Sequence, residues 1–159
     1  MNRHRLAVAI ALLALSAASA PLFAGGPYQY HAVTPCRVAD TRACSANNTT
    51  PYCGTGPGFG LVSFTFQGVC GVPSGATAVT LNATIVQATA AGFLKLFPAG
   101  TTEPLVSTLN FVAGEPALAN GAIVPLSALS VSQTTDLTAR IAVGPGTAYL
   151  VLDVTGYFQ

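Results

Sequence analysis

Charged side chains are scarce in this 159-residue chain, which has six Lys and Arg, five Asp and Glu, and no tryptophan. Charged residues make up 7% of the sequence, whereas a typical soluble domain has about 25%. Six scattered basic residues cannot form the positive cluster that binds a phosphate backbone, so we expect no nucleic-acid partner. With 51% hydrophobic residues the chain is also too apolar to be disordered, and a packed core is expected.

Groups that perform catalysis are equally sparse. Beyond the N-terminal segment, His31 is the only histidine, and the sequence has neither a Gly-x-Ser-x-Gly motif nor a Cys-x-x-Cys motif. A small hydrolase, the least favoured alternative, would need two of the few acidic residues about 5 to 9.5 Å apart across a cleft. We therefore expect a protein that is not an enzyme and that binds no metal and no cofactor.

The most apolar run in the sequence lies at its N-terminus. Arg3 and Arg5 precede the uncharged apolar residues 6–15, and small residues follow at positions 16–20. This order predicts a secretory signal peptide over residues 1–24, cut between 18 and 24, because a run of about ten apolar residues is half of what a membrane span needs. Residues 25–159 then form a single exported domain without an integral membrane span, and we expect it to be secreted, at the cell surface, extracellular or periplasmic.

All four cysteines, Cys36, Cys44, Cys53 and Cys70, lie in the first half of this exported domain. An even number of cysteines in an exported chain predicts disulfides, and four cysteines allow three pairings. Cys44 and Cys53 flank a polar stretch that is typical of an exposed loop, which favours a bridge between them. The remaining bridge would join Cys36 to Cys70.

Beyond the signal peptide, hydrophobic residues alternate with polar ones in short runs separated by Gly, Pro and Asn. About nine short strands are predicted, over residues 28–33, 60–66, 77–88, 92–97, 107–111, 122–126, 129–132, 137–143 and 148–158. Many short strands without a helical segment predict an all-β, disulfide-stabilised antiparallel β-sandwich, either jelly-roll or immunoglobulin-like.

The alternation also assigns faces and edges. In residues 77–88 the core face carries Val79, Leu81, Ala83 and Ile85, and the opposite face is rich in threonine. In the last strand one face carries Tyr149, Val151, Asp153, Thr155 and Tyr157. Neither strand contains the lysines that discourage strand addition, so either one would support self-association if it lies at a sheet edge.

A set of short motifs occurs in a fixed order along the chain. They are Pro35-Cys36-Arg37, Asp40-Thr41-Arg42, Cys70-Gly71-Val72-Pro73, Ser107-Thr108-Leu109-Asn110-Phe111, Ala119-Asn120-Gly121-Ala122-Ile123-Val124-Pro125-Leu126 and Asp153-Val154-Thr155-Gly156-Tyr157-Phe158. Over about residues 28–159 the chain resembles a β-rich module of exported bacterial proteins, found alone behind a signal peptide or appended to larger cell-surface proteins and some secreted cell-wall amidases. The resemblance implies an extracellular accessory or structural role, and it transfers no catalytic residue.

Two groups of residues are candidates for the structure and for binding. We expect Asp40 to pair with Arg37 or Arg42, and Asp153 to accept a hydrogen bond from a neighbouring loop. The candidates for stacking on a glycan are Tyr28, Tyr30, Tyr52, Tyr149 and Tyr157. The expected function is a non-catalytic structural or adhesive module that associates with its own copies, and the alternative is a module that binds carbohydrate, such as a cell-envelope polysaccharide.

Overall fold

The computed structural model describes residues 27–42 and 59–159 of the chain. The predicted signal peptide lies outside the described residues. Cys44, Cys53 and Tyr52 lie outside them as well, so the expected bridge between Cys44 and Cys53 stays a prediction.

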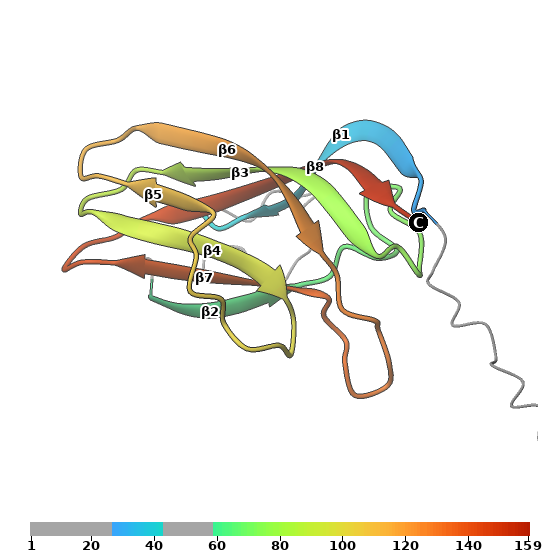
Figure 1. Ribbon diagram of the computed structural model, residues 1–159. Coiled ribbons are helices and arrows are strands. Elements are labelled where there is room, and N and C mark those ends of the chain that lie inside the picture. The colour runs from blue at the N-terminus through green and yellow to red at the C-terminus, as the bar shows by residue number, and fades with distance from the viewer. Residues whose placement is uncertain (1–26, 43–58) are drawn as a thin grey trace, which may run out of the picture.

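The described residues form eight strands and no helix. The strands are β1 (Tyr30–Asp40), β2 (Phe59–Phe64), β3 (Ala78–Val86), β4 (Gly92–Pro98), β5 (Leu109–Phe111), β6 (Ala117–Pro125), β7 (Leu137–Val143) and β8 (Tyr149–Phe158). They form two antiparallel four-stranded sheets, one in the order β1-β8-β3-β6 and the other in the order β2-β7-β4-β5 (Figure 1).

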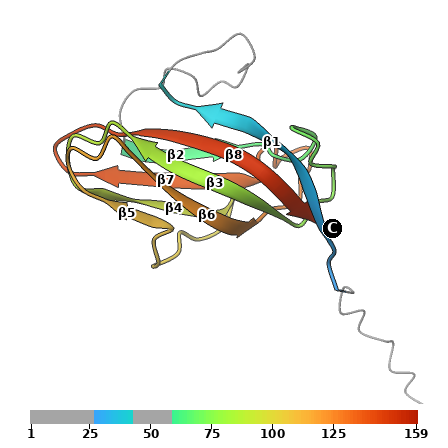
Figure 2. The same ribbon diagram turned by 90° about the horizontal axis from the view of Figure 1, so that it is seen from above.

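The strand pairs are nested within one another. The first strand pairs with the last, β2 with β7, β3 with β6, and β4 with β5. The chain therefore forms one long antiparallel hairpin that is rolled up, which is the jelly-roll form of the expected sandwich. The view from above shows the two sheets stacked along their length, with the start of β1 beside the end of β8 (Figure 2).

The inner faces of the two sheets form the core. Val79, Leu81, Ala83 and Ile85 of β3 are all buried, so their predicted face is confirmed. The opposite sheet contributes alternate residues of β4 and β7 to the same cluster, among them Leu94, Leu96, Leu137, Ala139 and Ile141. The period-two pattern is thus a direct consequence of packing one face of each strand against the other sheet.

Three expectations about the strands are wrong. The structure has eight strands rather than nine, because residues 129–132 belong to the loop between β6 and β7, where Val131 is fully exposed. A turn ends that apolar pattern after a few residues, since the Ser130 amide donates to the Gln133 carbonyl. The first strand is longer than predicted and runs to Asp40, and the sixth begins at Ala117 rather than at Ala122.

Neither β3 nor β8 is a sheet edge, so the self-association considered from the sequence for these two strands is excluded. Both strands lie inside their sheet, so their backbone groups already pair on two sides. The edges of this sheet are β1 and β6. Strand addition to this sheet must therefore use one of those two strands, and the edges of the other sheet are β2 and β5.

A bulge in β8 changes the face assigned to Tyr157. Gly156 lies opposite Thr80 and Val154 opposite Leu81, which leaves Thr155 as an extra residue. The extra residue inverts the alternation that follows it, because side-chain direction in a strand has a period of two. Tyr157 therefore packs against the core rather than sharing a face with Asp153, and its ring stacks on His31 at 4.9 Å.

A buried carboxylate joins two loops at one end of the sandwich. Asp136 is fully buried, and its oxygens accept hydrogen bonds from the Phe66 and Gln67 amides at 2.8 to 3.0 Å. Burial raises the pKa of this carboxyl above its ordinary value of 3.8, although the backbone donors oppose that effect. Nothing in the local sequence distinguishes Asp136, because both of its donors lie about 70 residues away.

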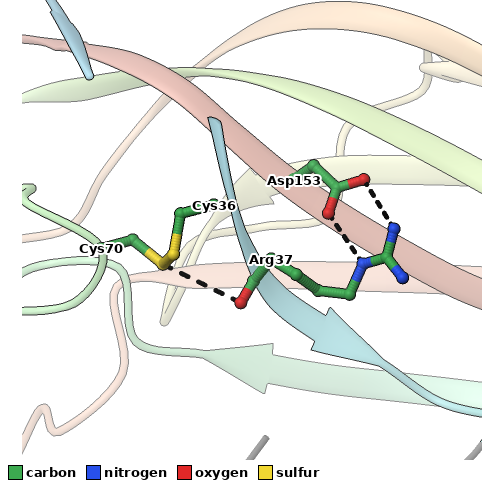
Figure 3. Close-up of a disulfide and its surroundings, with 4 residues drawn as sticks. All are labelled: Cys36, Arg37, Cys70 and Asp153. Carbon is green, nitrogen blue, oxygen red and sulfur yellow. Dashed lines mark hydrogen bonds and ion pairs between the residues drawn. A yellow bond between two sulfur atoms is a disulfide. The ribbon is translucent and has the colours of Figure 1, made fainter. Parts of the chain in front are cut away.

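The disulfide between Cys36 and Cys70 is present, as expected, and ties β1 to the turn that follows β2 (Figure 3). Cys36 pairs with Val154 in the β1–β8 ladder, so the bridge holds the middle of β1 against the sheet. The Sγ atom of Cys70 lies 3.8 Å from the carbonyl oxygen of Arg37. The bridge thus lies one residue away from the ion pair between Arg37 and Asp153.

We predict that replacing Cys36 and Cys70 together by alanine lowers the free energy of unfolding. The two cysteines are 34 residues apart, and closing a loop of that length removes about 3 to 4 kcal/mol of chain entropy from the unfolded state. Chemical denaturation measures the change, and peptide mapping without reduction should find Cys36 linked to Cys70 in the unaltered chain. An unchanged denaturation midpoint, or Cys36 linked to another cysteine, would contradict the prediction.

Candidate functional site

The outer face of the β1-β8-β3-β6 sheet carries most of the polar side chains named from the sequence. Strand register places Arg37, Asp153, Asn82 and Gly121 in one row across the four strands. Thr84 and Thr80 of β3 lie on either side of Asn82 along the same face, and Thr155 lies beside Thr80. We call this set, without Gly121 and together with Asp40 at the end of β1 and Arg42, which contacts Asp40, the polar face.

Every charged group on this face is paired with an opposite charge. Arg37 donates to both carboxylate oxygens of Asp153, at 2.8 and 3.2 Å (Figure 3). It also donates to Asp40 at 3.3 Å. Arg42 donates to both oxygens of Asp40, at 2.9 and 2.7 Å. Asp40 therefore contacts both arginines that the sequence offered as partners, and the partner of Asp153 is β1 rather than a loop. Two arginines and two aspartates leave the face without net charge.

These contacts change the proton affinities of the groups. The hydrogen bond from Arg42 lowers the pKa of Asp40 below its ordinary value of 3.8, although partial burial opposes it. The hydrogen bond to Asp153 raises the pKa of Arg37 above its already high value. The hydrogen bond to Asp40 likewise raises the pKa of Arg42, so Asp40, Arg37 and Arg42 stay ionised at neutral pH.

The uncharged side chains of the polar face keep free hydrogen-bonding capacity. The Asn82 amide nitrogen lies 3.4 Å from the hydroxyl of Thr84, and no described residue donates to the Asn82 carbonyl oxygen. The hydroxyls of Thr80 and Thr155 lie 3.1 Å apart, and Thr155 also donates to the Thr80 carbonyl. Asn82 therefore has an acceptor and an amide hydrogen left for a ligand.

A shallow hollow of about 510 Å³ opens on this face. Its walls come from three adjacent strands, β1, β8 and β3. The lining residues are Pro35, Cys36, Arg37, Asn82, Asp153 and Thr155. The hollow thus combines the paired charges with Asn82, a residue that the sequence did not single out for binding.

The tyrosines suggested for glycan stacking do not form one platform. Tyr157 is half-buried against the core, and Tyr30 covers Gly156 and packs against Phe158 at 5.4 Å. Tyr149 lies at the opposite end of β8, beside Val86. Tyr28 precedes β1 and is exposed. The remaining candidate, Tyr52, lies outside the described residues.

The β6 edge of the sheet is open along its length. The Leu126 amide donates to the Thr77 carbonyl, and the Gln87 amide donates to the Pro116 carbonyl. The backbone N–H and C=O groups of the even-numbered residues in this segment therefore point toward β3. Because donors and acceptors alternate along an antiparallel strand, the backbone groups of Ala117, Ala119, Gly121 and Ile123 point away from β3. The described part of the chain provides no hydrogen-bond partner for them.

Residues 27–42 and 59–159 hold no group of three or more His, Cys, Asp or Glu side chains placed to bind a metal ion. They also contain no helix with the length and apolar character needed to cross a membrane.

No protein-family model matches the chain, and no curated protein matches its sequence. Among solved structures, the chain is similar to the Tobacco streak virus coat protein dimer, with a TM-score of 0.39 and 11% identity over 80% of this chain and 86% of that chain. The C2 crystal form of the same coat protein gives a TM-score of 0.35 and 13% identity over 84% of this chain and 90% of that one. At these scores the likeness assigns neither a family nor a function.

We predict that Asp40 makes the fold sensitive to acid. Its pKa is lower in the folded chain than in the unfolded one, so its contribution to stability is present above about pH 3.8 and disappears as the pH falls through the folded value. For a surface ion pair the contribution is about 0.2 to 1 kcal/mol. Denaturation curves between pH 2 and 6 should show less acid destabilisation in Asp40→Asn. Arg42→Gln should have a similar effect, and an unchanged pH profile in both variants would contradict the assignment.

We also predict that Gly156→Ala loosens the start of β1. A Cβ atom at Gly156 would lie 2.5 Å from the Tyr30 ring, so the ring would have to move. The free energy of unfolding should fall by about 1 to 3 kcal/mol, as for other overpacked sites. In a Tyr30→Ala background the same change should cost much less, and equal costs in both backgrounds would show that the two residues are not coupled.

Proposed function

We propose that this chain is an exported bacterial β-rich module, secreted as a non-catalytic structural protein that associates with its own copies through β6. The observation that carries the proposal is the open, uncharged β6 edge. The localisation rests on the predicted signal peptide and on the motif resemblance. The disulfide between Cys36 and Cys70 supports an oxidising compartment outside the cytoplasm.

The two edges of this sheet differ in charge and in regularity, although β6 ends on a proline, Pro125. β1 contains Pro35 and Arg37, and its register with β8 is broken twice. Proline, charge and bulges all discourage another strand from pairing with an edge. β6 pairs with β3 over nine consecutive residues without a shift and contains no charged residue. A partner strand would therefore bind at β6.

The side chains of β6 leave room for such a partner. Ala117, Ala119 and Gly121 are exposed and small, and a Cβ added at Gly121 would meet no atom within 4 Å. Ile123 is 65% exposed on the same face. In an antiparallel pair of copies centred on Gly121, Ile123 of each copy packs on Ala119 of the other. About six backbone hydrogen bonds form between the copies.

The acidic residues of the polar face support a non-catalytic role. Asp40 and Asp153 both accept hydrogen bonds from Arg37. An acid catalyst in a glycosidase needs a raised pKa, whereas the pKa of Asp40 is lowered by its arginine partner. The acid whose pKa is raised, Asp136, is fully buried and accepts hydrogen bonds from backbone amides.

We predict that the combined change Ala119→Lys and Gly121→Lys abolishes self-association. Both positions are exposed on β6, so the lysines should leave the fold intact. In the proposed pair the two charges at position 121 would face each other across the two-fold axis, and each charge at position 119 would lie against Ile123 of the other copy. Sedimentation velocity of the unaltered chain over a concentration series should show a monomer–dimer equilibrium, and the variant should remain monomeric.

The matched control is Leu105→Lys with Val131→Lys, which adds the same charge at two fully exposed loop positions. This control should associate as the unaltered chain does. Equal loss of association in both double variants would assign it to the loops or to net charge rather than to β6. An unaltered chain that stays monomeric at all concentrations would contradict the proposal.

A further inference from the structure

We infer that the hollow on the polar face binds an uncharged polysaccharide through the hydroxyl groups of its sugar rings. The inference goes beyond the proposed assembly, because the hollow spans β1, β8 and β3 and is present in a single copy. Its hydrogen-bonding residues, Asn82 and Thr155, differ from the tyrosines suggested from sequence. Three properties of the face support it.

The first property is the balance of charge. Arg37, Arg42, Asp40 and Asp153 neutralise one another within a continuous set of ion pairs. An anionic ligand would have to break the contact of Arg37 with both oxygens of Asp153, and a cationic ligand would meet carboxylates that are already occupied. The face thus has no charge to complement, which favours an uncharged ligand.

The second property is a mixture of donors and acceptors at close spacing. Asn82 offers an amide hydrogen and a carbonyl oxygen that no described residue uses, and Thr155 adds a hydroxyl on the neighbouring strand. Neighbouring hydroxyls of a sugar ring each donate one hydrogen bond and accept others, so they match a side-chain amide that can do both. Asp153, beside Asn82 in the ladder, can still accept through the unused lone pairs of its oxygens.

The third property is the shape of the face. The hollow is open rather than enclosed, so it can contact part of a longer polymer without surrounding it. Tyr30 of β1 is about half exposed beside Gly156, whereas Val151, which lies between Asp153 and Tyr149 on the same face of β8, is buried. An open hollow of this kind suits a polysaccharide chain that continues past it better than a single enclosed sugar.

The test is binding of the purified full chain to soluble polysaccharides by affinity electrophoresis and titration calorimetry. The probes are dextran and galactomannan as neutral hexose polymers, chitin oligosaccharides as N-acetylhexosamine polymers, and polygalacturonate as an anionic polymer. We expect binding to at least one of the neutral probes and none to polygalacturonate. The comparison of dextran or galactomannan with chitin oligosaccharides shows whether the N-acetyl group is needed.

Asn82→Val should weaken this binding by about tenfold or more, since it removes both free polar groups from a central strand position where valine is well tolerated. Asn110→Val is the matched control, because Asn110 is exposed on β5 of the other sheet. It should bind as the unaltered chain does. Asn82→Asp, which is nearly isosteric, should also lose binding and serves if the valine variant does not fold.

Both Asn82 variants should keep the sedimentation behaviour of the unaltered chain, so a loss of sugar binding cannot arise from lost association. Failure of all neutral probes to bind, or binding to polygalacturonate alone, would overturn the inference. Equal binding by the Asn82 and Asn110 variants would place any sugar site elsewhere. None of these outcomes bears on association through β6, which is measured without polysaccharide.

Discussion

The pairing of β1 with β8 encloses every other strand pair of this fold. Arg37 and Asp153, which join the two strands through their side chains, are 116 residues apart. Contacts at such separations are slow to form, because much of the chain must be ordered before they stabilise it. The disulfide between Cys36 and Cys70 ties β1 to a turn near the middle of the chain. It thereby shortens the length of chain that separates β1 from β8. The polar face exists only when this outermost pair is in place, since the face is built across both strands.

Much of the fold was predictable because single strands carry their own pattern. Burial of alternate residues in β3, from Val79 to Ile85, follows directly from a period of two. The bridge between Cys36 and Cys70 followed from the polar stretch between the other two cysteines. These features depend on the local sequence, and that is where sequence patterns are informative.

Features that depend on distant partners were not predictable in the same way. The bulge at Thr155, which turns Tyr157 toward the core, shows only in the register between β8 and β3. Asp136 is an ordinary acidic residue of a polar loop until the Phe66 and Gln67 amides meet it. The open edge at β6 could be recognised only once the order of the strands was known. Asn82 could be recognised as a binding residue only once the hollow around it was known. Each of these needs the tertiary arrangement rather than a local motif.

The distribution of polarity across one sheet gives the molecule two distinct sides. Ion pairs gather at β1 and β8, where they hold the enclosing strand pair together and break the regularity of the β1 edge. Small uncharged residues gather at β6, where the backbone stays accessible. A copy that pairs at β6 would extend the sheet in that direction alone, because β1 does not present a matching edge. The proposed association through β6 would therefore join two copies and leave both polar faces on the same surface of the extended sheet.

The same β1–β8 pair decides how the domain responds to tension. Gln29 and Gln159 exchange two backbone hydrogen bonds, so the two ends of the described chain lie side by side. A pulling force applied at these ends acts across the ladder and opens its pairs one after another, as in a zipper. Only the pairs Tyr30–Phe158, His31–Tyr157 and Ala32–Gly156 precede Cys36. At Cys36 the covalent bridge passes the load on β1 to the turn after β2, so β1 is held there by a covalent bond, whereas β8 is held only by its pairing with β1 and β3.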